Sequence, residues 1–276
     1  MIRGKYLGKN DVKRFSALAA ILCLVTAVQA PDAATQTATV DSGPASADQP
    51  TIGTPSAKQV EVPFVGCKSD GQMGPKPAPK AREPTQTVAA GVAGSLAYYA
   101  SEDLGVLAPR GWYCAGLYGS NGDILIVSAT PVRASALLRS NSGLKGPAIQ
   151  LTIRSGETSG RFEVAEIAAR LFPSKRDFVQ RVIDEDIQPA SDFPFGPYPA
   201  DIVTRRSDAD VEFVTPPHRS GMGTKSRLAE GGEPIYGLAL MTDDNSVVLL
   251  DVRMPKALRH LAPAIVEVTH REYITN

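Results

Sequence analysis

The chain has 276 residues with 29 basic and 29 acidic side chains, and 43% of its residues are apolar. This length is sufficient to bury a hydrophobic core, and the composition is that of a globular protein rather than a disordered or fibrous one. The balanced charge argues against a nucleic-acid partner, because no basic excess is present to neutralise phosphates.

The first 30 residues have the layout of a secretory signal peptide. Five basic residues precede an uncharged, mainly apolar run from Phe15 to Val28, and small residues lie at Ala27 and Ala30. A basic start, a short apolar segment and a small-residue cleavage site are the three parts of such a peptide. Cleavage after either alanine stays open, because Pro31 disfavours the later site. No apolar run in the chain reaches the 18 residues that a membrane-spanning helix needs, so we expect no transmembrane segment in the mature protein.

Two alternatives exist for this segment. A lipoprotein signal would centre on Cys23, but Leu22 is too large for that motif, and the flanking charges disfavour a buried apolar helix. Removal of residues 1–30 takes away five basic residues and one acidic residue, so the remaining chain has a net charge of −4. The sequence therefore predicts a mildly acidic protein that is periplasmic or secreted.

The segment after the signal peptide predicts a linker. Residues 31–60 are rich in Ala, Thr, Ser, Gln, Asp, Pro and Gly and lack apolar periodicity, which is typical of disorder. Residues 61–276 are predicted to form a single domain. Its first part, residues 61–84, should be extended, because prolines exclude a helix there. These prolines are Pro75, Pro77, Pro79 and Pro84.

Two cysteines remain after removal of the signal peptide, Cys67 and Cys114. An even pair in an exported protein favours a disulfide, which would tie residues 61–84 to the rest of the domain. Two free thiols, or a nucleophilic Cys114 with a histidine base, are the alternatives.

In chain order, helical spacing of apolar residues first predicts a helix over about residues 85–100. A hairpin follows, with strands from Trp112 to Tyr118 and from Asp123 to Ala129, because Asn-Gly is a strong hairpin signal. Ile149, Leu151 and Ile153 alternate with polar residues and predict a strand with one buried face.

The second half of the chain contains more helical patterns. A helix is predicted from Gly160 to Phe172, and a second one around residues 178–183, with Ser174 and Asp177 in a capping arrangement. The segment from Asp192 to Pro199 should be irregular because it contains three prolines. A short strand is expected over residues 211–214.

The C-terminal region predicts a second hairpin and a final helix. Its strands, from Pro234 to Met241 and from Ser246 to Met254, are nearly continuously apolar, which favours central strands covered on both faces. Helical spacing returns after Pro255, with a kink or a new helix start at Pro263. Strand pairs joined by tight turns predict an α+β domain with a mainly antiparallel sheet and helices packed on its faces.

Three segments of the chain resemble a group of uncharacterised exported bacterial proteins over roughly residues 60–272. They are Val62–Gln72 (VPFVGCKSDGQ), Gly105–Cys114 (GVLAPRGWYC) and Phe193–Pro199 (FPFGPYP). This resemblance implies export but no activity. From Pro109-Arg110-Gly111-Trp112 to about residue 274, the order of elements is similar to the Mog1/PsbP-like fold. That similarity implies a curved antiparallel sheet with helices on its faces, in a binding or assembly module.

Catalytic motifs are weak in this sequence. His218 is expected to be a loop histidine, and Ser142 with Lys145 matches a Ser-x-x-Lys pattern without its companion motifs. Residues 221–225 (GMGTK) are short and rich in glycine, but lack the spacing of a phosphate-binding loop, so we expect a turn. The carboxylates at residues 184–186, Asp208 and Asp210 are expected to be solvated. We predict no catalytic residue, metal or cofactor.

The aromatic residues of one hairpin and one proline-rich loop form a possible ligand patch, because rigid aromatic side chains on irregular segments make good contact surfaces. These residues are Trp112, Tyr113, Tyr118, Phe193, Phe195 and Tyr198. Packing against the core is the alternative. The sequence favours an exported, non-catalytic binding or assembly module of the cell envelope, with a protein or glycan partner. The other candidate is a hydrolase of envelope carbohydrates or esters with a spatially assembled site.

Overall fold

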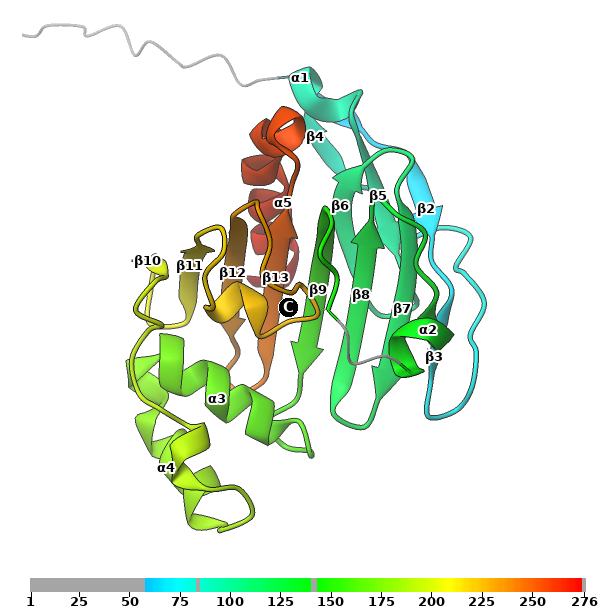
Figure 1. The fold of residues 1–276 in the computed structure, drawn as a ribbon. Coiled ribbons are helices and arrows are strands. Elements are labelled where there is room, and N and C mark those ends of the chain that lie inside the picture. Colours follow the sequence, from blue (N-terminus) through cyan, green and yellow to red (C-terminus); the bar gives the residue numbers. More distant parts are fainter. Residues whose placement is uncertain (1–57, 83–84, 140–142, 275–276) are drawn as a thin grey trace, which may run out of the picture. The chain divides into compact units, whose positions relative to one another are not determined.

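A long antiparallel sheet is the main element of the computed structural model, which describes residues 58–82, 85–139 and 143–274 (Figure 1). Eight strands follow the order β10-β11-β12-β13-β9-β8-β7-β3, and only β3 and β7 are parallel. The strands are β3 (Ser69–Gly71), β7 (Tyr113–Gly119), β8 (Gly122–Ser128), β9 (Ala148–Arg154), β10 (Ile202–Arg205), β11 (Asp210–Thr215), β12 (Ile235–Met241) and β13 (Val247–Arg253). The α+β class and the mainly antiparallel pairing are confirmed.

The predicted signal peptide lies outside the described residues, as does most of the predicted linker. The first strand, β1, begins at Gln59 and so includes the last two residues of that predicted linker. Among the described residues, no helix combines the length and apolar character needed to cross a membrane.

Two smaller sheets accompany the main one. β2 (Phe64–Gly66), β5 (Leu96–Ala100) and β6 (Gly105–Pro109) form one, and β1 (Gln59–Glu61) and β4 (Thr87–Ala89) form the other. The helix predicted over residues 85–100 is wrong, because this region contains β4, the four-residue helix α1 (Ala90–Ala93) and β5. Two glycines weaken the helix here, and all of β5 is buried between neighbouring strands.

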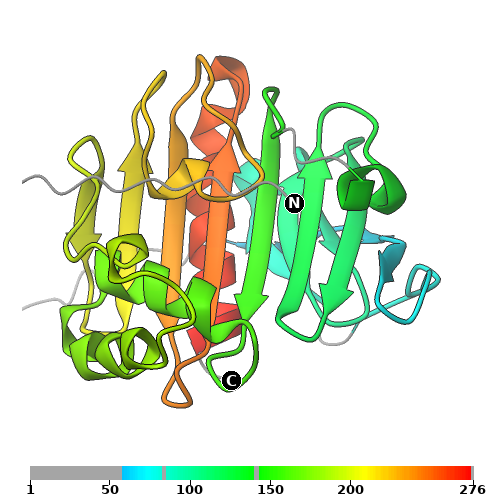
Figure 2. The same ribbon diagram turned by 60° about the horizontal axis from the view of Figure 1, so that its bottom comes forward.

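The helices lie on opposite faces of the main sheet. One face carries α5 (Ala262–Ile274). The apolar side chains of this helix belong to a core cluster that also includes side chains of β5, β6 and β13. On the other face, α3 (Arg161–Leu171) and α4 (Arg176–Asp184) pack near the β12–β13 turn, and α2 (Ala134–Arg139) packs on β7 and β8 (Figures 1 and 2). The middle of this second face, over β9 and β13, lies between two apolar clusters.

Most predicted strands and helices in the second half are confirmed within a few residues. Pro263 lies in the first turn of α5, so it marks a new helix start. The predicted cap at Ser174 is wrong, because Pro173–Lys175 forms a short 3-10 turn and the Ser174 hydroxyl donates to the carbonyl oxygen of Asp208. The strands β6 and β10 and the helix α2 were not predicted from the sequence.

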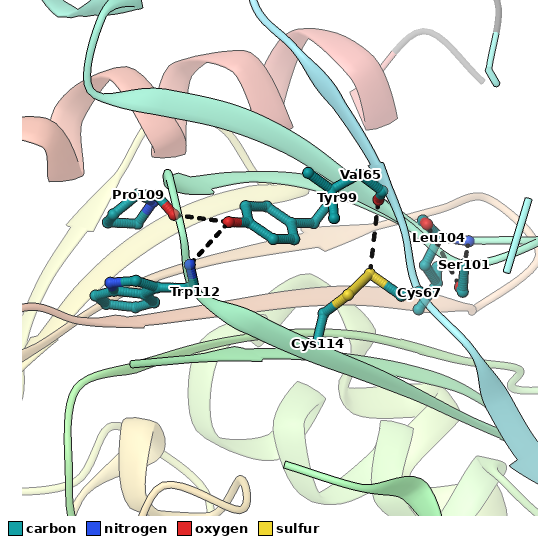
Figure 3. Close-up of a disulfide and its surroundings, with 8 residues drawn as sticks. All are labelled: Val65, Cys67, Tyr99, Ser101, Leu104, Pro109, Trp112 and Cys114. Atoms are coloured by element: carbon teal, nitrogen blue, oxygen red, sulfur yellow. Dashed lines mark hydrogen bonds between the residues drawn. A yellow bond between two sulfur atoms is a disulfide. The ribbon is translucent and has the colours of Figure 1, made fainter. Parts of the chain in front are cut away.

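The two cysteines connect the extended N-terminal segment to the main sheet. Their Sγ atoms lie 2.04 Å apart, which is the bonding distance of a disulfide, and join the residue after β2 to β7. Cys67 is buried, and Figure 3 shows the pair near Tyr99, whose hydroxyl donates to the Pro109 carbonyl oxygen and accepts from the Trp112 amide. This is the pairing that the sequence predicts.

Candidate functional site

A row of polar side chains lies on β9, near the middle of the main sheet. Gln150, Thr152 and Arg154 are 3%, 4% and 7% exposed, and they point to the face that carries α3. Because side chains alternate along a strand, Ile149 and Leu151 enter the opposite core. The sequence predicted one buried face for this strand, whereas both faces are buried.

The neighbouring strand β13 extends this polar row. Its register places Asp251 opposite Gln150 and Arg253 opposite Ala148. Asp251 and Arg253 are also buried, although β13 is otherwise apolar. Two charged residues within a strand that the sequence predicts to be covered on both faces are the signal by which this site could have been found from the sequence.

Two segments form walls above the polar row. α3 contributes Glu163 and Glu166, which are one turn apart and so share a face of the helix. The loop between β11 and β12 contributes Lys225, Ser226 and Arg227.

Asp201 fixes the position of that loop. Its carboxylate accepts hydrogen bonds from the Thr215 hydroxyl and the Met222 amide, both at 2.7 Å, and the Gly223 amide donates to the Thr215 hydroxyl. The glycine-rich segment of residues 221–225 therefore uses these amides for internal contacts. A turn between two strands is what the sequence predicts there.

The walls enclose a cleft with two adjoining lobes. We call the two lobes together the polar cleft. The first lobe, about 350 Å³, lies over Gln150, Thr152 and Arg154. The second, about 340 Å³, is lined by the proline-rich loop and the side chains of Arg170 and Gln188. Glu166, Tyr198 and Lys225 line both lobes.

Hydrogen bonds and ion pairs order the side chains of the polar cleft. Arg154 is paired with Glu163, and the Lys225 ammonium lies 2.5 Å from the Glu166 carboxylate. The Gln150 amide nitrogen donates to the Thr152 hydroxyl at 2.9 Å, and its carbonyl oxygen accepts from the Arg227 backbone amide at 2.9 Å. The side chains that would contact a ligand are thus held in place.

Asp251, which lies opposite Gln150 in the sheet, is a buried carboxyl group without a hydrogen-bond partner among the described residues. Its side chain is fully buried. Burial raises the pKa of this carboxyl well above its ordinary value, and the Asp201 carboxylate raises it further. Desolvation favours the protonated form because that form has no charge to solvate.

We expect Asp251→Asn to raise the free energy of unfolding relative to wild type more at pH 8 than at pH 4, because the neutral amide has no proton to lose. The difference between the two pH values should be about 1.4 kcal/mol for each pH unit by which burial raises the pKa of the carboxyl. Folded Asp251 keeps its proton at pH values where the unfolded chain, with a pKa of about 3.9, loses it. Wild-type stability should therefore fall as pH rises above about 4, and the variant should lack this fall. Urea unfolding of both proteins at pH 4 and pH 8 measures the difference.

Asp201→Asn is the matched control, because both oxygens of the Asp201 carboxylate accept hydrogen bonds, in contrast to those of Asp251. Its replacement should lower stability at pH 8. A stability difference between wild type and Asp251→Asn that is the same at both pH values would contradict the assignment of a buried, protonated Asp251.

Arg253 holds two loops at the edge of the polar cleft. Its guanidinium donates to the carbonyl oxygens of Gly146, Ala229 and Leu144. Burial lowers the pKa of this side chain from its ordinary value. The three carbonyl groups take the place of water around a cation that is 1% exposed.

The six aromatic residues predicted as a ligand patch do not form one surface. On the hairpin, Trp112 packs against the main core, Tyr113 is 49% exposed, and Tyr118 donates to the Gly74 carbonyl oxygen beneath Lys76.

The aromatic residues of the proline-rich loop lie at a different site. Phe193 is buried and lines the second lobe of the polar cleft, and Tyr198 lines both lobes beneath the Arg170 guanidinium. Phe195 is 40% exposed, stacks with Arg176 and lines neither lobe.

A separate apolar groove of about 670 Å³ lies between α5 and strands β10–β12. Ile202, Tyr236 and Val266 are among the residues that line it. Charged side chains at this groove form ion pairs, such as Arg206 with Glu212 and Arg259 with Glu233.

The remaining candidates lie away from the polar cleft. His218 is exposed in a loop, with a backbone φ of 56°, and Ser142 lies outside the described residues. Asp210 was expected to be solvated, but it is 4% exposed and lies 2.6 Å from the His270 ring on α5. That expectation is wrong because the helix packs on the start of β11 and excludes water from the carboxylate.

Comparisons with known proteins give no match to the chain among protein-family models, curated proteins or solved structures.

Proposed function

We propose that this protein is an exported, non-catalytic binding module of the bacterial cell envelope, and that it holds a small polar ligand in the polar cleft. The observation that carries the proposal is the row of buried hydrogen-bonding side chains on β9, open to a cleft of small-molecule size. These side chains line the cleft, and their hydrogen bonds and the Arg154–Glu163 ion pair hold them in place, as in a preformed small-molecule site.

Export is supported by the N-terminal signal-like segment and by the paired cysteines. Disulfides persist in oxidising compartments such as the periplasm. Expression of the full chain in a bacterium, followed by fractionation and intact-mass measurement, tests this part. We expect a periplasmic or secreted product. Its mass should correspond to cleavage after Ala27 or after Ala30, with the loss of 27 or 30 N-terminal residues. A cytoplasmic product with an intact N-terminus would contradict it.

Hydrolysis is the second candidate function, because Glu163 and Glu166 both line the first lobe. A glycosidase needs two carboxyl groups that flank the scissile bond, one of which donates a proton. Here the two residues lie on the same wall, and each is paired with a cation. This arrangement favours binding over acid catalysis.

Thermal unfolding of the exported protein with a panel of polar compounds tests ligand binding. The panel contains neutral sugars, amino acids, organic acids and inorganic phosphate. We expect at least one class to raise the Tm of wild type, because a ligand that binds only the folded state stabilises it. The rise should be lost in Lys225→Met and kept in Lys76→Met, a surface lysine paired with Glu102. No rise with any class, or an equal rise in Lys225→Met, would overturn the proposal.

A further inference from the structure

We infer that the ligand of the polar cleft is a neutral carbohydrate of two sugar rings that lies across Tyr198, an inference that rests on the proposed function. The two lobes are similar in volume, about 350 and 340 Å³, and Tyr198 lines both of them. Each lobe has the size of a small-molecule site. A ligand with two linked rings would therefore place one ring in each lobe.

The charges of the polar cleft favour a neutral ligand. Three acidic and four basic side chains line the two lobes, and the two acids of the first lobe are paired with Arg154 and Lys225. The two other cations also have partners in the protein, because Arg170 donates to the Gly196 carbonyl oxygen and Arg227 donates to that of Leu137. The ligand need not supply an anion to balance them. A charged ligand would lose its hydration on binding and would need new ion pairs to offset that loss. Arg154, Lys225 and the two acids of the first lobe are already paired with each other and cannot supply such ion pairs without breaking their own.

The hydrogen-bonding groups of the polar cleft fit the hydroxyl groups of a sugar. Gln150, Thr152 and Ser226 line the first lobe, and Gln188 and Ser191 line the second. Amides and hydroxyls both donate and accept, as sugar hydroxyls do.

Tyr198 supplies the apolar surface that a sugar ring requires. Its ring packs under the Arg170 guanidinium at 4.0 Å, which fixes its orientation at the boundary between the lobes. An aromatic ring with a polar end suits a ligand that has apolar C–H faces and polar edges. The proline-rich backbone of residues 193–199 restricts the loop that carries it.

Isothermal titration calorimetry of the exported protein tests this inference. The probes are the neutral disaccharides cellobiose, maltose and N,N′-diacetylchitobiose, with glucose as a single ring and digalacturonate as an anion. We expect at least one neutral disaccharide to bind about tenfold more tightly than glucose, as contacts in the second lobe are added. Tyr198→Ala should weaken its binding by about tenfold, and Tyr198→Phe should retain it.

Phe195→Ala is the matched control, because Phe195 lies in the same loop and also stacks under an arginine but lines neither lobe. It should leave the affinity unchanged, and circular dichroism should show that every variant is folded. Lys225→Met, at the boundary of the lobes, is the second variant if Tyr198→Ala does not fold.

The outcomes separate the inference from the proposed function. Binding of digalacturonate alone, or of amino acids or phosphate alone in the thermal panel, would overturn the neutral-sugar inference and leave the binding function standing. No binding of any probe or panel member would overturn both. A disaccharide affinity that Tyr198→Ala leaves unchanged would overturn the assigned position.

Discussion

Replacement of both Cys67 and Cys114 by alanine is expected to lower the free energy of unfolding by about 4 kcal/mol. The bond closes a loop with a sequence separation of 47 residues, and its loss would free the unfolded chain from this constraint. Cys67 is also buried next to the three-stranded sheet, so the extended segment of β2 and β3 would loosen first. Guanidinium unfolding of the exported proteins measures the change.

Treatment of both proteins with a thiol reductant is the control for this prediction. Wild type treated with a thiol reductant should approach the stability of the double variant, while the double variant should not respond to it. A loss below about 1 kcal/mol in the double variant would contradict the stabilising role of the bond.

Arg253→Met is expected to lower the free energy of unfolding by about 3 kcal/mol. The guanidinium is the hydrogen-bond donor to three loop carbonyl groups, and each buried acceptor without a partner costs about 1–3 kcal/mol. The substitution also removes the desolvation penalty of a buried cation, which offsets part of the loss in the free energy of unfolding. Urea unfolding of the variant measures the net effect.

Arg205→Met is the matched control for Arg253→Met. Arg205 is exposed on β10 and its side chain donates to the carbonyl oxygen of Leu171, so its replacement should cost no more than about 1 kcal/mol. Equal losses in the two variants would contradict the special role of Arg253. Hydrogen exchange should also rise at residues 226–229 in Arg253→Met, because this loop is held by the guanidinium at Ala229.

The fold was largely predictable where the signals are local. Ser120 and Asn121 form the turn between β7 and β8, and Gly122, the first residue of β8, has a φ of 126°; the hairpin predicted from the Asn-Gly pair is present. The helix α3 and the strands β12 and β13 follow from their apolar patterns. The helix expected over residues 85–100 failed because helical spacing and a buried strand cannot be told apart in a short apolar run.

The candidate site was predictable only in part. Phe193 and Tyr198 were identified as contact residues and line the polar cleft, whereas Trp112 packs into the core. The polar row on β9 was visible in the sequence as Gln150 and Thr152. Its burial was not visible, because α3 and the loop of residues 225–227 reach it from distant parts of the chain.

The α+β class, the strand partners in the two hairpins and the cysteine pair can be derived from the sequence, since each depends on local periodicity, turn chemistry or a simple count. The tertiary structure alone decided that Asp251 and Arg253 lie buried beside Gln150, and that α3 and the β11–β12 loop close a cleft above them. Alternation along a strand shows that its two faces differ, but the elements that pack on each face are set by contacts between residues far apart in the chain.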